Sequence, residues 1–313
     1  MPRSKRASSS LFAAAALIAC VFASTRAEAF CRTTTDRNNT VQNGQCVGTG
    51  RPIFWKNRCV GYSLEKIASR QVAYDDATRE LAAAFARWAG ASCVVDGAGS
   101  GRASIDVRDL GAVECANFGY NKEGENQNVI IFRDDSWPHK NSETTIALTT
   151  VTFLPSTGEI VDADMEINTF ERKMSLSDTP AADGYDFPSV VTHEAGHFLG
   201  LAHSPVKDAT MYFEYNQGQT NKRYLKTDDV AGICEIYRPD GTRSAEGGPA
   251  AAGATCDPLP RRGIARTCAD DSTTCSAGSQ TTSSSGVLAS AVLISALGVA
   301  VLRRRKSGSA AGR

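Results

Sequence analysis

Three of the four histidines of the chain lie in the run His-Glu-Ala-Gly-His-Phe-Leu-Gly-Leu-Ala-His, which begins at His193. On a helix, His193 and His197 are four residues apart, so both imidazoles project from one face and can reach one metal ion. Gly200 can take the left-handed conformation that ends a helix, which would return His203 to the same point. Three neutral nitrogens with a fourth position left to water describe a catalytic zinc site rather than a closed structural one.

Glu194 follows the first of these histidines directly. Zinc lowers the pKa of its bound water to about 7 and polarises a carbonyl under attack. A carboxylate beside the metal can take the proton from that water and pass it to the leaving amine, which makes Glu194 the predicted general base. A structural zinc site has no use for a carboxylate there, so the pattern predicts hydrolysis.

The stretch HEAGHFLGLAHS resembles the HExxHxxGxxH signature of the metzincin peptidases, and Ser204 after the last histidine resembles the matrixin branch. The family also has a methionine turn beneath the metal, and Asp-Ala-Thr-Met-Tyr places Met211 there. The resemblance covers about residues 53–238. It implies a zinc endopeptidase with one catalytic Zn²⁺ and an α+β zincin fold. That fold has a twisted, mostly parallel five-stranded sheet with one antiparallel edge strand, an active-site helix, a backing helix and a small C-terminal subdomain holding Met211.

The residue two positions after the methionine departs from the family pattern. Matrixins usually have a proline there, which helps to wall the pocket for the substrate's first leaving-side residue, whereas this chain has Phe213. Astacins and serralysins place a tyrosine there as a switchable zinc ligand, so its absence disfavours those branches. The preferred substrate residue is therefore left open.

Two predicted strands, 144–153 and 159–167, are joined by Pro-Ser-Thr-Gly. In the second strand Asp162, Asp164 and Glu166 alternate with apolar residues, which places three carboxylates on one face. The pair resembles the matrixin strand, loop and edge strand that bind an extended protein or peptide substrate by strand addition. Matrixins often hold calcium with acids of this edge strand, which implies Ca²⁺ at Asp162 and Asp164; a solvated acidic face is the alternative. A second zinc is not expected, because the only spare histidine is His139.

The remaining elements follow from periodicity and caps. A helix is expected over 75–88 with an aspartate cap, the active-site helix near Asp186 and Pro188, and a last helix from Thr227. Short strands are expected at 61–64, 103–107 and 128–132. Three glycines between residues 97 and 101 precede a strand rather than a helix, so they indicate a turn rather than a phosphate loop.

The two ends of the chain differ in charge from its middle. Nine of the 34 Lys/Arg lie in 1–29 and 303–313, and the remainder holds 25 basic and 33 acidic residues, a net charge near −8. This acidic body argues against a nucleic-acid partner. Residues 1–29 have a basic start, a short apolar run and Ala-Glu-Ala before Phe30, typical of a cleaved signal peptide; an uncleaved anchor is the alternative. We therefore expect an exported, monomeric protein, extracellular or at the cell surface.

Nine cysteines follow this leader, which favours an oxidising compartment. Matrixins are commonly kept latent by a pro-segment cysteine within a PRCGxPD-like stretch, which this chain lacks. Cys31 and Cys46, in the N-terminal segment 30–52 of a catalytic region 30–238, could block the metal or form a disulfide. Nine is odd, so one cysteine needs a separate explanation.

The composition changes after residue 238. Residues 239–285 are rich in Gly, Ala, Ser, Thr and Pro and predict a flexible stalk, in which Cys256 and Cys268 could close one loop. Six cysteines in the catalytic region and two in the stalk can pair, which leaves Cys275.

Segment 286–306 holds an apolar run over 287–302 and then a basic cluster, followed by a tail at 307–313. The run predicts a short membrane helix with the basic cluster on the cytoplasmic side. The arrangement resembles the tripartite sorting signals of bacterial surface proteins, and Cys275-Ser276 is closest to the myxobacterial kind, in which the cysteine is the processing point. This implies attachment to the cell envelope; a plain membrane anchor is the alternative.

Two other functions are compatible with the motif. A surface adhesin or binding module could retain the zinc scaffold without turnover, but a retired site gains nothing from Glu194. A zinc enzyme acting on a non-peptide ester or amide would not need the two-strand arrangement that binds a peptide backbone.

Overall fold

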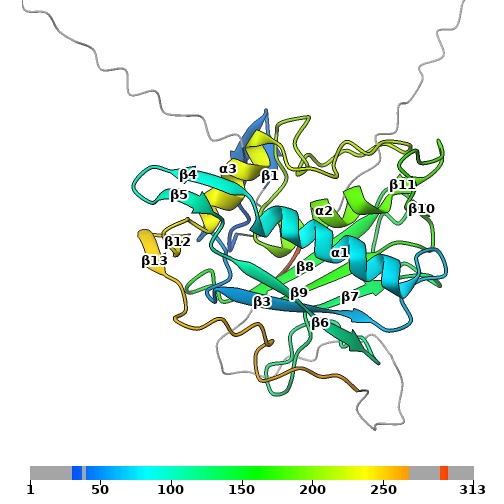
Figure 1. Cartoon of the computed structure of the whole chain (residues 1–313), viewed down its shortest axis with the longest axis horizontal. Helices are drawn as coiled ribbons and strands as arrows, with labels where there is room; N and C mark the ends of the chain where they lie inside the picture. Colours follow the sequence, from blue (N-terminus) through cyan, green and yellow to red (C-terminus); the bar gives the residue numbers. More distant parts are fainter. Residues whose placement is uncertain (1–29, 37–39, 268–289, 295–313) are drawn as a thin grey trace, which may run out of the picture.

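A mixed β-sheet with helices against one face forms the centre of the molecule (Figure 1). The computed structural model describes residues 30–36, 40–267 and 290–294. The sheet order is β14-β8-β9-β7-β3-β6, in which β6, β3, β7 and β9 are parallel and β8 and β14 are antiparallel to their neighbours. The strands are β3 (Cys59–Glu65), β6 (Asp106–Val113), β7 (Val129–Phe132), β8 (Ala147–Phe153), β9 (Ile160–Ile167) and β14 (Ser290–Ile294). The predicted α+β fold, with four parallel strands and one antiparallel strand, is confirmed, and β14 is an addition to it.

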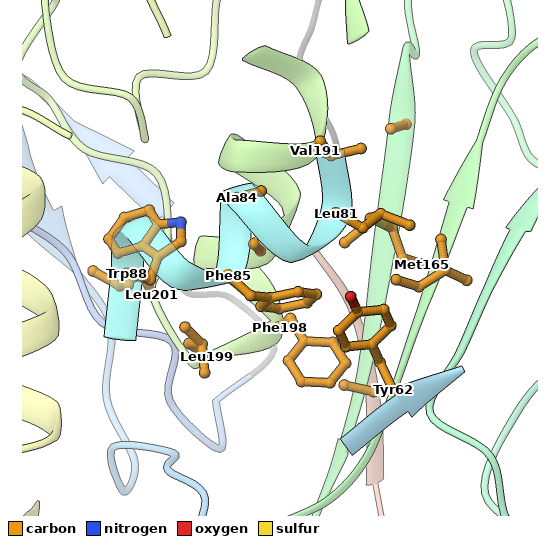
Figure 2. Packing of buried hydrophobic residues seen from close by; sticks show 14 of the residues in the cluster. Tyr62, Leu81, Ala84, Phe85, Trp88, Met165, Val191, Phe198, Leu199 and Leu201 are labelled. Carbon is orange, nitrogen blue, oxygen red and sulfur yellow. The ribbon is translucent and has the colours of Figure 1, made fainter. Parts of the chain in front are cut away.

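Two helices, α1 (Tyr74–Ala89) and α2 (Phe187–Phe198), pack against each other and cover this face. Aromatic rings join the layers: Tyr62 of β3 stacks on Phe85 of α1 at 4.7 Å between centroids, and Phe85 meets the edge of Phe198 of α2 at 5.0 Å (Figure 2). Such pairs contribute beyond their buried area. The N-cap of α1 is Ala73, so the predicted aspartate cap is wrong; the acids lie in the first turn, where they still complement the helix dipole.

Of the two strands predicted as a pair, the outer one is the first strand, β8, and not the second strand, β9. β8 lies outside β9, and β9 lies between β8 and β7, so the assignment of the acid-bearing strand to the sheet edge is wrong. Alternation identified which residues share a face of β9 but could not tell which neighbours pair with it. Strand β6 also begins at Asp106, later than predicted.

The predicted membrane helix over 287–302 is wrong at Ser290–Ile294, which form β14 and pair antiparallel with β8. Apolar residues suit a strand as well as a helix, and an open sheet edge offers backbone partners. In the parts of the chain that the structure describes, no helix combines the length and the apolar character needed to cross a membrane. The predicted leader, Cys268, the sorting residue Cys275 and the rest of the apolar run lie outside the described residues.

Residues 239–267 pack against the sheet domain instead of forming a free stalk. They include the hairpin of β12 (Thr242–Ala245) and β13 (Gly248–Ala251), beside α3 (Thr227–Ile236). The guanidinium of Arg243 is fully buried, donates to the Trp55 carbonyl at 2.8 Å and lies 4.9 Å from the Tyr237 ring centre. The boundary predicted at residue 238 therefore falls inside the folded unit.

Three disulfides are described in full. Cys31 pairs with Cys46, which confirms a disulfide rather than a metal-blocking cysteine in this segment. Cys93 pairs with Cys234, and Cys59 with Cys256, so the predicted Cys256–Cys268 loop is wrong. Cys115 is disulfide-bonded as well. The small elements are β1 (Thr40–Gln42), β2 (Gln45–Val47), β4 (Ser92–Val95), β5 (Gly99–Arg102), β10 (Met174–Ser175) and β11 (Tyr185–Asp186).

Candidate metal centre

Helix α2 carries the first two histidines and is buried along its whole length. The Asp186 carboxylate caps it by accepting from the Ser189 backbone N–H at 3.0 Å, and Pro188 stands in its first turn, as predicted. The helix ends before Gly200, whose φ of +98° is the left-handed conformation expected there. The chain turns at this glycine and brings His203 back beside α2.

The three imidazoles converge through one nitrogen each. The Nε2 atoms of His193 and His197 are 3.1 Å apart, and those of His197 and His203 are 3.3 Å apart. His193 Nδ1 lies 2.6 Å from the Thr210 carbonyl oxygen and His197 Nδ1 lies 2.9 Å from that of Leu201. Because a carbonyl can only accept, each Nδ1 carries the hydrogen and each facing Nε2 presents a lone pair.

This donor set fits a zinc ion. Facing lone pairs without a hydrogen between them repel unless a cation lies among them, and imidazole nitrogens are ordinary zinc ligands. Burial is the main cause that lowers the pKa of all three histidines, that of His197 to about 4, so the rings are neutral as metal binding requires. Within the described part of the chain, these histidines form a three-residue cluster whose nitrogens lie within 4.8 Å of one another.

Glu194 is buried with one carboxylate oxygen in use. Its Oε2 accepts from the Thr149 hydroxyl at 2.6 Å, whereas Oε1 has no hydrogen-bond partner among the described residues. Burial raises the pKa of Glu194 to about 8, against opposing contributions from Thr149 and Lys222. Sequence reasoning missed Thr149; as a hydroxyl residue in the strand that packs against α2, it gave no signal of its own.

Met211, the predicted turn methionine, packs against Gly196 of α2, next to the second histidine. A side chain on Gly196 would collide with Met211 Sδ and come within 2.8 Å of the Trp88 ring, so only glycine lets the turn approach α2 this closely. Asp229 of α3 fixes the turn, because its carboxylate accepts from the backbone N–H groups of Thr210 at 2.8 Å and Met211 at 3.0 Å.

Ser204 and Phe213 flank the centre. The Ser204 hydroxyl donates to Asp228 at 2.6 Å and its backbone N–H to the Met211 carbonyl at 2.9 Å, so it ties the third histidine to α3 and to the methionine turn. Phe213 is 41% exposed, with its ring centre 6.2 Å from that of His203.

The acids of β9 are not solvated, so that alternative is wrong. Asp162, Asp164 and Glu166 are all buried on the face of the sheet away from the helices. Asp164 accepts from the backbone N–H groups of Gly119 at 2.6 Å and Val129 at 2.7 Å, and Glu166 pairs with Arg133 and with the spare His139, each at 2.6 Å. Asp162 Oδ2 has no partner in the described structure. The three acids therefore lie together around one carboxylate oxygen without a partner, at a place separate from the histidine cluster.

Comparison with known proteins identifies the region around this centre. Residues 111–238 match the Matrixin family. The chain is 34% identical over 103 residues to matrilysin of Homo sapiens, and the matched stretch covers 33% of this chain and 35% of that protein. It is 37% identical over 95 residues to metalloendoproteinase 5-MMP of Arabidopsis thaliana, covering 30% and 26%. It is 47% identical over 55 residues to metalloendoproteinase 1-MMP of the same plant, covering 18% and 15%. The chain thus contains a matrixin-like domain and spans about a third or less of the length of these relatives.

Proposed function

We propose that this protein is a zinc-dependent endopeptidase. The observation that carries the proposal is the convergence of three Nε2 atoms beside a buried carboxylate with one free oxygen, all within eleven residues from His193 to His203. The similarity to matrilysin and to the plant metalloendoproteinases supports it. Zinc held by the three histidines would polarise the scissile carbonyl and lower the pKa of the attacking water.

Glu194 is the general base in this proposal. Its free Oε1 takes a proton from the attacking water and passes it to the leaving amine. The hydroxyl of Thr149 holds Oε2, which fixes the plane of the carboxylate. Burial raises the pKa of Glu194, and zinc held beside it would lower that pKa again, which favours the ionised carboxylate that accepts the proton.

The substrate is proposed to be a protein or peptide, bound extended along β8. The pairing of Ser290–Ile294 with β8 supports this, because it demonstrates that the outer edge of β8 accepts an antiparallel strand. In that register Ile294 lies opposite Thr149, the residue that contacts Glu194. A substrate that takes the place of Ser290–Ile294 on this edge would therefore pass the general base.

Export, followed by attachment to the cell envelope through the tail and Cys275, is proposed for the location of the enzyme. The described disulfides support an oxidising compartment, since such bonds are rare where thiols are kept reduced. The alternative of a binding module without turnover is disfavoured by Glu194. A buried carboxylate with an unpaired oxygen costs free energy that a site without catalysis would have no reason to retain.

Replacing Glu194 by Gln tests the mechanism. The variant keeps the shape of the side chain and one oxygen that can accept from Thr149, but it cannot take a proton, so cleavage of casein should fall about 100-fold or more. Zinc content per chain, measured on the same samples, should be unchanged, and Glu123→Gln on the exposed surface is the matched control. Full activity in the Glu194→Gln protein would refute the assigned base. A folded, zinc-loaded wild-type protein that cleaves neither casein nor a peptide library would favour the binding module.

Calcium at Asp162 and Asp164 stays a prediction, now with Asp162 as its centre, because both oxygens of Asp164 already accept from backbone N–H groups. Added Ca²⁺ should raise the melting temperature of the protein, since a ligand that binds only the folded state stabilises it. Asp162→Asn should abolish that increase. An equal increase in both proteins would place any bound calcium elsewhere.

A further inference from the structure

Lys222 is a buried cation close to the candidate metal centre. The residue is 2% exposed, and its ammonium donates to the carbonyl oxygens of Thr210, at 3.2 Å, and Tyr212. No carboxylate of the described residues lies within ion-pair distance of it. Two carbonyl groups satisfy two of the three N–H donors, and Asp229, Glu194 and Glu214 attract the ammonium only from beyond ion-pair distance. An ammonium buried without an anion in direct contact is costly.

The position of this cation relates it directly to the reaction. The Thr210 carbonyl that accepts from Lys222 is also the partner of His193 Nδ1, so a single carbonyl group lies between the ammonium and a zinc-binding ring. Tyr212 is on the other side of Met211, and the centres of the Tyr212 and Tyr215 rings lie 5.8 and 5.9 Å from the ammonium. The ammonium of Lys222 thus lies in the methionine-turn wall of the centre, residues 210–215, close to two aromatic rings.

A purely structural role does not account for a charge at this place. Asp229 already fixes the methionine turn through the N–H groups of Thr210 and Met211, and a neutral donor could satisfy the two carbonyls equally well. Bound zinc would add two positive charges close to the ammonium and increase the free-energy cost of keeping the ammonium charged. The burial that penalises the charge lowers the pKa of Lys222 to about 7, against the attraction of Asp229, Glu194 and Glu214. An anion that arrives with the substrate would reverse this penalty.

The geometry points to Lys222 as a specificity-determining residue that pairs with the carboxylate of an aspartate or glutamate side chain of the substrate. In an extended peptide successive side chains point in opposite directions, so one residue next to the scissile bond directs its side chain into the methionine-turn wall. The first leaving-side residue is the one expected to meet the wall that includes Phe213. The inference rests on the proposed endopeptidase function and defines its substrate class as peptides with an acidic residue at that position.

Matched peptides test this preference in the zinc-loaded protein. One peptide sequence is prepared with Glu, Gln or Leu as the residue that follows the cleaved bond, and cleavage sites are assigned by mass spectrometry. The Glu peptide should be cleaved with about 10-fold or higher kcat/KM than the Gln peptide, because only the carboxylate compensates the buried charge. In Lys222→Met the Gln peptide should be cleaved faster than the Glu peptide, and the Leu peptide should be the best substrate of the three.

Two further variants separate charge from folding. Lys222→Arg keeps a cation and should keep the preference for Glu over Gln, while Lys207→Met, on the exposed surface of a nearby loop, should leave all three rates unchanged. If the wild-type protein cleaves peptides without preferring Glu, or if Lys222→Met retains that preference, the inference is wrong and the proposed function stands. If the zinc-loaded wild type cleaves no peptide, the proposed function fails and the inference fails with it.

Discussion

Burial acts in opposite directions on the acids and bases of the metal centre. It lowers the pKa of His197 to about 4 and raises that of Glu194 to about 8, because in both cases water no longer stabilises the charged form. The imidazoles are consequently neutral ligands over the whole physiological range, and the carboxylate becomes a stronger base. A single physical cause therefore prepares both the metal ligands and the proton acceptor.

A second buried pair of acids, Asp162 and Asp164, predicts how stability depends on pH. Burial, and then the charge of Asp164, raise the pKa of Asp162 well above its usual value, and burial raises that of Asp164 to about 6. An acid whose pKa is higher in the folded chain than in the unfolded chain binds more protons when folded. Its contribution to stability is present below about pH 4, the pKa of an unfolded aspartate, and is lost as the pH rises through about 6 and beyond.

Asp162→Asn should remove much of the stability loss that occurs as the pH rises. Without added metal, the free energy of unfolding of the variant should exceed that of the wild type by about 1–3 kcal/mol at pH 7.5, with a smaller difference at pH 5. Urea denaturation at the two pH values measures it, and the exposed Asp208→Asn serves as control. The three buried histidines add a pH dependence of their own, but they are common to both proteins and cancel in the difference. A difference independent of pH would contradict the prediction.

At the scale of the elements, the start of α2 is joined to the segment that carries Lys222. The Asp186 carboxylate caps α2 and also receives two hydrogen bonds from Arg223, at 2.8 and 2.6 Å. Asp186 is fully buried and the Arg223 side chain is 15% exposed. One carboxylate therefore positions both the helix that carries the first two zinc ligands and the neighbour of the proposed specificity residue.

Asp186→Ala should destabilise the protein by about 3–5 kcal/mol, because it removes the buried carboxylate from a largely buried guanidinium, which keeps only the exposed Asp178, and leaves a helix without its cap. Asp186→Asn retains a capping oxygen and should cost clearly less. Urea denaturation of the two variants measures the difference. If Ala and Asn are equally destabilising, the cap contributes nothing and the ion pair alone accounts for the loss.

Local sequence patterns predicted the elements that carry the site residues better than they predicted the elements and residues packed around them. The cap at Asp186, the turn at Gly200 and the shared face of the β9 acids depend on nearby residues, and all are present in the structure. Thr149 could not be predicted, since its contact with Glu194 depends on which strand packs against α2. Lys222 could not be predicted either, because a lysine in a polar loop gives no sign of being buried.

At the scale of the whole molecule, composition was misleading beyond residue 238. Gly-, Ala- and Pro-rich sequence is typical of a stalk, but it is equally compatible with irregular chain that packs on a domain. What decides between them is distant along the chain: Arg243 donates to the Trp55 carbonyl, and Cys256 pairs with Cys59, 197 residues away. Neither contact leaves a periodic signal, so only the three-dimensional structure extends the folded unit to residue 267.

The Cys59–Cys256 disulfide should accordingly stabilise the whole domain and not only a terminal segment. Closing so long a loop restricts the unfolded chain strongly, and its removal in Cys59→Ala/Cys256→Ala should cost about 2–5 kcal/mol. Urea denaturation measures this, and limited proteolysis with mass spectrometry should find new cuts between residues 246 and 267 while Arg243 still holds β12. The same proteolysis of Arg243→Met, with the disulfide intact, should open β12 and leave the region around Cys256 protected. Unchanged stability and unchanged cuts in the double variant would mean that residues 239–267 are attached without the disulfide. The folded unit would then depend on Arg243 and on backbone hydrogen bonds such as those of Gly253 with Lys56 and Ala265 with Asn126.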